Sequence, residues 1–282
     1  MKKNYKLLAT LVLSGLAGAA FGVLPAEAAV TVRSADGTEK SLTETEFTSL
    51  YGNKYMDSTS GNTVSISGEG TVTLKGETVS LGGLSYTAST LAGAYALESG
   101  DASNNKLSVT DGASVSFSNA TDNWIAGGIS MKGAASGNQV TLSGVSLNLP
   151  DAITSSLKIA GGVSASASAS GNTVTLSNST AQSLDIYGGY GYMEYYGDTS
   201  AEADAVAGVN HNTVTLTNTS ASGTRVYGGY MEYYGDTSAE ADAGVNHNTV
   251  TLTNSTAQSS DIYGGYMEYY GDTSAEADAV AG

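Results

Sequence analysis

The chain of 282 residues contains no cysteine, and it has only two prolines, two histidines and one tryptophan. Without cysteine there is no disulfide framework, no thiolate nucleophile and no zinc or iron–sulfur site with cysteine ligands. Basic residues are also scarce, with 11 Lys and Arg against 27 Asp and Glu, which gives a formal net charge of -16. Because proteins bind nucleic acids and anionic membranes chiefly through Lys and Arg, this balance argues against both as partners.

The scarcity of histidine limits the chemistry as well. His211 and His247 occupy the same place in consecutive copies of a repeat. A Ser-His-Asp triad needs one histidine with an orienting partner and a nucleophile in reach, so we do not expect this kind of hydrolase. We expect both histidines to be solvent-facing turn residues before a strand. A transition-metal site formed by stacking the two histidines is the alternative.

The first 28 residues have the pattern of a secretory signal peptide. Three early lysines precede an apolar run over residues 7–24, and Ala-Glu-Ala at 26–28 provides small residues for cleavage after Ala28. A membrane anchor is the alternative, because the apolar run is just long enough to span a bilayer. Cleavage removes three lysines and one glutamate, which changes the formal charge from -16 to -18. The sequence therefore predicts an exported, acidic mature chain with no further hydrophobic span.

Two short phrases alternate through the rest of the chain. The first has the form Asn-Thr-Val-Thr-Leu, with spacings of 43, 33, 34, 40 and 36 residues, and begins at Asn62, Asn105, Asn138, Asn172, Asn212 and Asn248. The second is Leu-Ala-Gly at Leu91, Ile-Ala-Gly-Gly at Ile125 and Ile159, and Ile-Tyr-Gly-Gly or Val-Tyr-Gly-Gly at Ile186, Val226 and Ile262. Self-similarity at periods of this length is typical of proteins built from stacked structural repeats.

Both phrases predict β-strands. In Asn-Thr-Val-Thr-Leu the apolar residues alternate with threonine, so Val174 and Leu176 fall on one face of a strand and the threonines on the other. We therefore predict an all-β protein, a parallel β-helix or β-solenoid of stacked repeats of about 33–43 residues over residues 61–282, after a capping or irregular segment at 29–60. The leading asparagine suits a turn with left-handed backbone geometry, and its stacked copies predict an amide ladder along the solenoid axis.

Differences between the copies agree with strands. The copy after Tyr187 has two insertions of two residues each, at 191–192 and 206–207, and an even number preserves which side chains of a strand face inward. The same alignment places Arg225 between Asp185 and Asp261 on neighbouring coils, and opposite charges favour that register. Drift at one exposed position is the alternative explanation. Whether Tyr187 or the glycine after it faces the core stays open.

A signal peptide followed by Asn-x-Val-Thr-Leu and Ile-Tyr-Gly-Gly repeats, in an acidic, glycine-rich, cysteine-free chain, resembles the passenger region of Gram-negative autotransporters. The resemblance covers about residues 50 to 282. It implies a right-handed parallel β-helix exported to the cell surface, with adhesin-like binding to host or biofilm glycans or proteins. The family's C-terminal outer-membrane barrel is missing from this sequence, which stops inside a repeat at Gly282. This suggests a fragment of a longer repeat array that carries such a barrel, and a free secreted or periplasmic repeat protein that ends at Gly282 is the alternative.

Two sets of residues are candidate sites. The acids of a late repeat predict either a solvated loop or a Ca²⁺ site, because stacked carboxylates repel unless water or a cation separates them: Glu232, Asp236, Glu240 and Asp242. Paired tyrosines recur in the same repeats and predict either ring packing between coils or a binding stripe for glycans or proteins: Tyr195, Tyr196, Tyr233, Tyr234, Tyr269 and Tyr270.

The sequence argues against an enzyme. A glycosidase needs one asymmetric pair of carboxyl groups, and identical acids repeated along an axis supply no asymmetry. A polysaccharide lyase would need a base near its carboxylates, whereas the mature chain has only Arg33 and Arg225 as arginines. We therefore expect a non-enzymatic exported surface protein without a required cofactor. A secreted carbohydrate-active β-helix enzyme and a Ca²⁺-dependent structural repeat protein are the alternatives.

Overall fold

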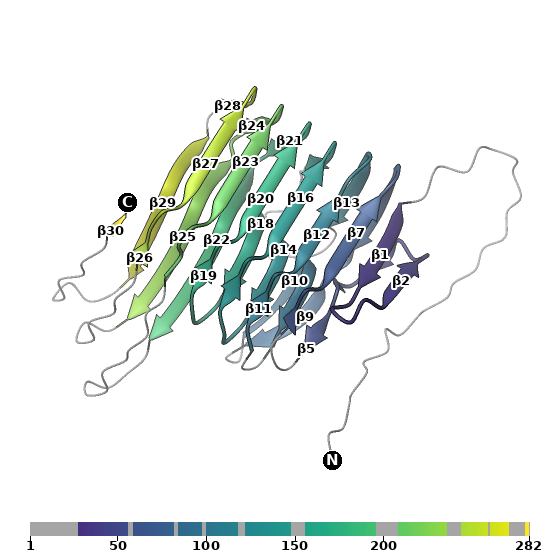
Figure 1. Cartoon of the computed structure of the whole chain (residues 1–282), viewed down its shortest axis with the longest axis horizontal. Coiled ribbons are helices and arrows are strands. Elements are labelled where there is room, and N and C mark those ends of the chain that lie inside the picture. The colour runs from purple at the N-terminus through teal and green to yellow at the C-terminus, as the bar shows by residue number, and fades with distance from the viewer. Residues whose placement is uncertain are drawn as a thin grey trace, which may run out of the picture.

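A computed structural model describes residues 28–55, 59–81, 84–97, 100–117, 122–147, 156–195, 208–235, 244–258, 260–270 and 280–281. These residues form strands and turns only, and most strands pair in parallel with the equivalent strand of the next coil (Figure 1). The predicted all-β solenoid of stacked repeats is confirmed. Residues 1–27 lie outside the described residues, so the signal peptide stays a prediction. Among the described residues, no helix has the length and apolar character that crossing a membrane requires.

The first sheet contains the Asn-Thr-Val-Thr-Leu strands, and we call it the Thr sheet. Two strands of residues 29–60 pair antiparallel at its N-terminal edge, and the other strands are parallel. Its strands, in spatial order, are β2 (Glu39–Leu42), β1 (Ala29–Arg33), β7 (Thr63–Ser67), β12 (Lys106–Val109), β16 (Gln139–Ser143), β20 (Thr173–Ser177), β23 (Thr213–Thr217) and β27 (Thr249–Thr253).

The second sheet contains the Ile-Tyr-Gly-Gly strands, and we call it the Tyr sheet. Its main path runs through β29 (Asp261–Tyr270), β25 (Arg225–Gly235), β22 (Leu184–Tyr195), β18 (Ser156–Ser164), β14 (Asp122–Ser130), β10 (Leu84–Ala96) and β4 (Leu50–Tyr51). Two further strands pair with β10, namely β5 (Lys54–Tyr55) in parallel and β9 (Glu77–Leu81) antiparallel.

Shorter sheets close the coils at their corners. One contains β19 (Ala169–Ser170), β15 (Ala135–Ser136), β11 (Ala102–Ser103) and β6 (Thr59–Ser60). Another contains β17 (Ser146–Leu147), β21 (Thr180–Gln182), β24 (Ser220–Ser222) and β28 (Thr256–Gln258). The remaining ones are the trio β13 (Ala113–Phe117), β8 (Gly70–Leu74) and β3 (Glu46–Phe47), and the pair β26 (Gly244–Val245) and β30 (Val280–Ala281).

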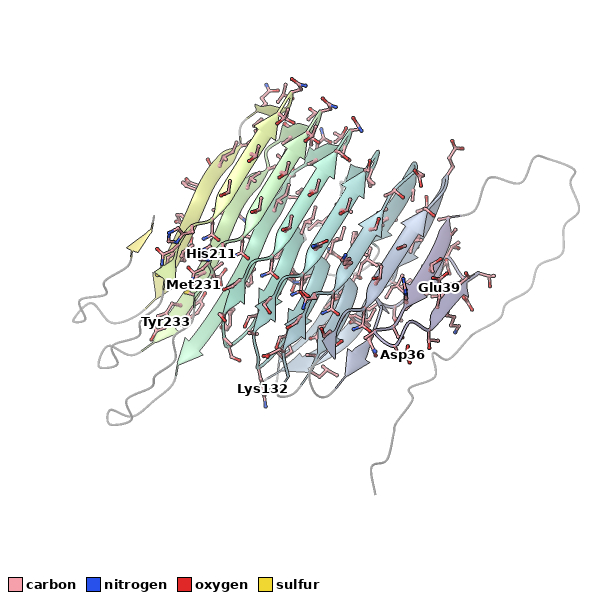
Figure 2. The ribbon with its side chains drawn as sticks, viewed as in Figure 1. Asp36, Glu39, Lys132, His211, Met231 and Tyr233 are labelled. Carbon is pink, nitrogen blue, oxygen red and sulfur yellow. The ribbon has the colours of Figure 1, made fainter. Side chains whose placement is uncertain are left out.

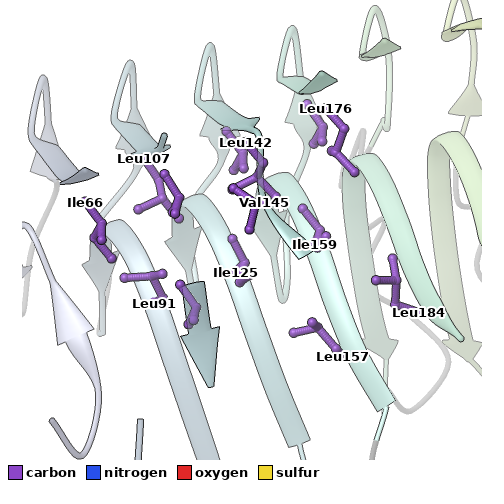
Figure 3. Packing of buried hydrophobic residues seen from close by; sticks show 14 of the residues in the cluster. Ile66, Leu91, Leu107, Ile125, Leu142, Val145, Leu157, Ile159, Leu176 and Leu184 are labelled. Carbon is purple, nitrogen blue, oxygen red and sulfur yellow. The ribbon is translucent and has the colours of Figure 1, made fainter. Parts of the chain in front are cut away.

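The core consists of aliphatic rows between the Thr sheet and the Tyr sheet. Val174 and Leu176 of β20 are fully buried, as predicted, and so are their equivalents in neighbouring coils. Both belong to the same cluster as Ile186 of the Tyr sheet. Figure 3 shows two members of this cluster, Leu176 of the Thr sheet and Ile159 of the Tyr sheet. Since each coil places its branched side chains on those of the next, burial of an apolar row requires a neighbouring coil.

The predicted amide ladder is present. Every ladder asparagine from Asn62 to Asn212 donates both its backbone N–H and its side-chain Nδ2 to Oδ1 of the asparagine on the next coil, at 2.9–3.1 Å. From Asn105 onwards, Nδ2 also donates to a backbone carbonyl, as Asn172 does to Ala135 at 2.9 Å. The ladder thus satisfies buried polar groups that would otherwise be costly to bury.

The left-handed turn lies one residue earlier than we predicted. The residue before each ladder asparagine has positive φ, with values of 54° to 72°: Gly61, Asn104, Gly137, Gly171, His211 and His247. The ladder asparagines are not among the residues with positive φ, and the backbone N–H of each one from Asn62 to Asn212 donates to the next coil. The turn therefore selects glycine, asparagine or histidine, while the ladder selects asparagine.

The two phrases of the repeat fit each other across the interior. A Cβ on Gly161 would lie 2.7 Å from the backbone nitrogen of Thr173 and 2.9 Å from Cβ of Asn172. A Cβ on Gly162 would fall on the amide group of Asn172 itself. The paired glycines thus leave the space that the ladder asparagine occupies, which is why Gly-Gly and Asn recur together.

Candidate functional site

The Tyr sheet has a cluster of buried apolar side chains on each of its faces. Successive residues of a strand point to opposite faces, so Ile186 packs in the core while Tyr187 belongs to a second cluster outside it. Its buried members are Ala92, Ala126, Ile129, Ala160, Val163, Tyr187, Tyr190, Tyr227 and Tyr230. We call this cluster, on the face that points away from the core, the aromatic face.

A local irregularity at the first glycine brings two tyrosines to the aromatic face. The pairing of β18 with β22 passes from Tyr187 to Gly189 and omits Gly188. Gly188 faces the interior, where a Cβ would lie 3.0 Å from Cβ of Asn212. Tyr187 and Tyr190 are therefore three residues apart yet meet on one face, with ring centroids 5.1 Å apart. This settles the open orientation: the glycine faces the core and Tyr187 faces away.

Two tyrosine rows run along the aromatic face. In the first, Tyr187, Tyr227 and Tyr263 stack with centroids 5.4 Å apart and ring planes 10° apart. In the second, Tyr190, Tyr230 and Tyr266 stack at 5.6 Å with angles of 16° and 11°. The first row was visible in the sequence as the Tyr of Ile-Tyr-Gly-Gly. We missed the second, although the tyrosine after each Gly-Gly signalled it.

Glutamates of the next coil accept hydrogen bonds from the second tyrosine row. The Tyr230 hydroxyl donates to Glu268 Oε2 at 2.7 Å, and the Tyr190 hydroxyl forms the same kind of bond with Glu232. Burial raises the pKa of Tyr187, Tyr190 and Tyr230 above the ordinary value. For Tyr190 and Tyr230 the neighbouring glutamates raise the pKa further. For Tyr227, burial is the largest cause, and its pKa rises from 10.0 to about 12.

These pKa values predict a loss of stability in alkali. The unfolded chain loses its phenolic protons near pH 10, whereas the folded chain holds them to higher pH. The raised pKa values therefore contribute their full stabilisation below pH 10, and this contribution is lost as the pH rises through about 12. We expect the urea midpoint of residues 29–282 to fall over this range. A variant with phenylalanine at Tyr187, Tyr190, Tyr227 and Tyr230 should show a flatter profile. Ionisation of every tyrosine near pH 10 while the chain stays folded would contradict the assignment.

A charged row borders the aromatic face. The register places Trp124, Lys158, Asp185, Arg225 and Asp261 in one line across five coils, so the predicted Asp-Arg-Asp alignment is confirmed and extends to a second cation. Arg225 donates to both carboxylate oxygens of Asp185, through Nε at 2.7 Å and Nη2 at 2.6 Å. Lys158 Nζ lies 4.8 Å from the centroid of the Trp124 ring.

Removal of the guanidinium should destabilise the fold measurably, because Asp185 is only 4% exposed and would lose two charged hydrogen bonds. We expect Arg225→Met to lower the free energy of unfolding by about 1.5–3 kcal/mol. Lys75→Met provides the control, since the exposed pair of Lys75 with Glu46 should contribute only about 0.2–1 kcal/mol. Equal losses in the two variants, measured by urea unfolding, would show that the Arg225 pair is a surface pair like the other.

The predicted calcium ligands divide between described and undescribed residues. Glu232 lies on the aromatic face of β25, half-buried, in register with Tyr192 and Glu268. The stacked Glu232 and Glu268 each accept a hydrogen bond from a tyrosine, which offsets their repulsion. Asp236, Glu240 and Asp242 lie outside the described residues. No group of three or more His, Asp or Glu that could hold a metal ion occurs in the described part of the chain.

Tyr233 and Tyr234, the predicted pair whose side chains the structure describes, occupy opposite faces of β25. Tyr233 is 4% exposed and packs inside with Val209, Met231 and Val245 (Figure 2), whereas Tyr234 lies on the other face against Tyr192, with centroids 5.3 Å apart. Tyr233 therefore contributes to packing. Tyr269 and Tyr270 pair in register with Tyr233 and Tyr234, Tyr195 pairs with Gly235, and Tyr196 lies outside the described residues.

The two histidines form an exposed stack. His211 and His247 have φ values of 57° and 55°, and their rings lie 4.9 Å apart with planes 3° from parallel. They are solvent-facing turn residues, as predicted (Figure 2). Parallel rings direct their nitrogen lone pairs side by side, so this geometry does not converge on a shared metal ion.

No protein-family model matches the chain, and neither a curated protein nor a solved structure does. The structure by itself carries the classification: the chain is a β-solenoid repeat protein with an aliphatic core, an asparagine ladder and rows of equivalent side chains on its outer faces.

Proposed function

We propose that the mature chain is a non-enzymatic, exported surface protein that acts as an adhesin-like passenger of the autotransporter type. One observation carries the proposal: neighbouring coils pair in register, so equivalent outward side chains form straight rows along the solenoid. A row offers the same contact at each coil. A partner with repeated groups, such as a glycan or a protein of a host surface or biofilm, then meets several contacts at once.

The mechanism is multivalent. Once one contact has formed, the next is intramolecular and has a high effective concentration, so affinity grows with the number of coils without any strong individual site. A rigid rod favours this because little conformational freedom is lost on binding. The repeated acids and the paired histidines support the non-enzymatic part of the proposal, because neighbouring coils give them equivalent environments rather than the distinct environments of a catalytic pair.

Deletion of residues 61–282, with the export signal kept, tests the proposal in the bacterium that produces the chain. We expect attachment to host cells or biofilm to fall, and unchanged attachment would remove the adhesin function. Release of reducing or unsaturated sugar by purified residues 29–282 would instead indicate the carbohydrate-active enzyme. A gain of β circular dichroism on addition of calcium would indicate the Ca²⁺-dependent structural protein.

A further inference from the structure

The outer face of the Thr sheet has a hydroxyl group at the same position of all eight strands. The pairing registers place these residues in one continuous row: Ser41, Thr31, Ser65, Ser108, Thr141, Thr175, Thr215 and Thr251. All eight are exposed or half-exposed. Within the described part of the chain, none of their hydroxyl groups is occupied by a side-chain hydrogen bond, so these groups are available to a partner.

The row has regular spacing in two directions. Adjacent strands lie about 4.8 Å apart and alternate residues of one strand about 6.6 Å apart, so eight strands present hydroxyls over about 34 Å. Further Ser and Thr residues flank the row on β20, β23 and β27. Side chains tipped with oxygen cover the strands of this sheet in Figure 2, and the strands run nearly parallel in Figure 1. Side-chain ladders such as the asparagine ladder hold sheets flat over many strands.

The charge of this face is unlike that of the whole chain. From β7 to β27 its outward residues are Thr, Ser, Gln139 and Lys106, with no acid among them, although the chain has 27 acidic residues. The Tyr sheet, in contrast, carries Asp185, Glu232 and Glu268 on its outer face. From β7 to β27 this face therefore matches an uncharged partner, whereas Glu39 lies on the same face at its N-terminal edge, on β2.

A single hydroxyl contact is weak, so the partner must make many such contacts at once. Each contact exchanges a hydrogen bond with water for one with the partner and yields only about 0.5–1.5 kcal/mol. A flexible glycan in solution would lose more conformational entropy than such contacts return. A rigid partner with its own regular rows of hydroxyl groups engages many contacts together and loses little freedom on binding.

We propose that the hydroxyl row of the Thr sheet binds the surface of an ordered, uncharged polysaccharide. The inference rests on the proposed function, because it names the class of partner that the adhesin-like surface recognises. The row lies along the solenoid axis, so the polysaccharide chains lie along that axis too, and each coil contributes one central hydroxyl contact.

A triple variant of the row tests this with microcrystalline cellulose as the probe. Thr141→Val, Thr175→Val and Thr215→Val remove three hydroxyls but keep the β-branched shape that suits a strand. We expect residues 29–282 to bind cellulose, the Val variant to bind at least tenfold more weakly, and Ser at the same positions to restore binding. Thr180→Val with Thr256→Val, on the exposed outer sides of β21 and β28, is the matched control and should bind like the unchanged chain.

Each other outcome overturns the inference in a recognisable way. Equal binding by the Val variant would show that another face holds cellulose. Failure of the unchanged chain to bind cellulose, while it still attaches to cells or biofilm, would overturn the inference and leave the proposed function standing. Loss of both would contradict both. Inhibition of ice growth by the unchanged chain but not by the Val variant, without cellulose binding, would show that the row recognises ordered water.

Discussion

Gly161→Ala should lower the free energy of unfolding of residues 29–282 by more than about 3 kcal/mol, a large effect for one methyl group. The added Cβ would overlap the carbonyl oxygen of Gly188 on the next coil and would lie 2.7 Å from the Thr173 nitrogen. Thr173 pairs with Gln139 and Thr213, and Tyr187 and Gly189 on either side of Gly188 pair with both adjacent coils. Neither atom can therefore move without disturbing a sheet.

The same substitution at Gly264 is the matched control. Gly264 occupies the equivalent position of coil β27–β29, where a Cβ would meet only the carbonyl oxygen of Asn248, at 3.4 Å. Neither glycine has positive φ, so alanine is not strained by its backbone at either site. We expect Gly264→Ala to be neutral or to stabilise by about 0.4–1 kcal/mol, because alanine reduces the freedom of the unfolded chain. Similar urea midpoints for the two variants would contradict the packing described here.

Asn172→Ala should lower the free energy of unfolding by about 3–5 kcal/mol, because several buried groups lose their partners together. Asn172 Oδ1 accepts from the backbone N–H and from Nδ2 of Asn138, and its own Nδ2 donates to Asn212 Oδ1 at 3.0 Å and to the Ala135 carbonyl at 2.9 Å. Alanine has no polar side-chain atoms, so the buried N–H groups of Asn138, Asn212 Oδ1 and the Ala135 carbonyl would each lose a hydrogen-bond partner.

Asn178→Gly is the control for the asparagine variant. Asn178 is exposed, has a φ of 51° that glycine adopts readily, and shares one exposed hydrogen bond with Asn218. We expect its urea midpoint to change little. If Asn172→Ala were as mild as Asn178→Gly, the buried ladder would not be a main source of stability.

Much of the fold could be predicted from the sequence because the same residue pattern recurs at equivalent positions of successive coils. The alternation in Asn-Thr-Val-Thr-Leu fixed the inward residues of β20 and its equivalents, and the spacing placed Arg225 opposite Asp185. The ladder asparagines could be predicted for the same reason. The position of the left-handed turn could not, because Asn at one site and Gly or His before it suit such a turn equally well by residue type.

The site was less predictable, because it depends on which residues meet across coils. A Gly-Gly pair in a sequence usually indicates a flexible segment. Here it leaves room for the asparagine that comes just before a strand of the opposite sheet. Omission of Gly188 from the pairing also reverses the usual alternation, which puts Tyr190 on the face of Tyr187 and turns Tyr233 inward. Periodicity places the hydroxyls of β7 to β27 on one outer face, but the extension of the row to Thr31 and Ser41 comes from antiparallel strands outside the repeat and could not be predicted.

The most direct test of the account is to remove one coil and measure both folding and attachment. Deletion of residues 212–247 joins His211 to Asn248, which recreates the native His-Asn junction and brings β20 beside β27. A solenoid should tolerate this, since each coil contacts chiefly its neighbours. We predict unchanged β circular dichroism per residue and cooperative unfolding, with attachment reduced about tenfold because avidity depends steeply on the number of contacts. Loss of folding would contradict the stacked-coil architecture, and full attachment by the folded shorter chain would contradict multivalent binding along it.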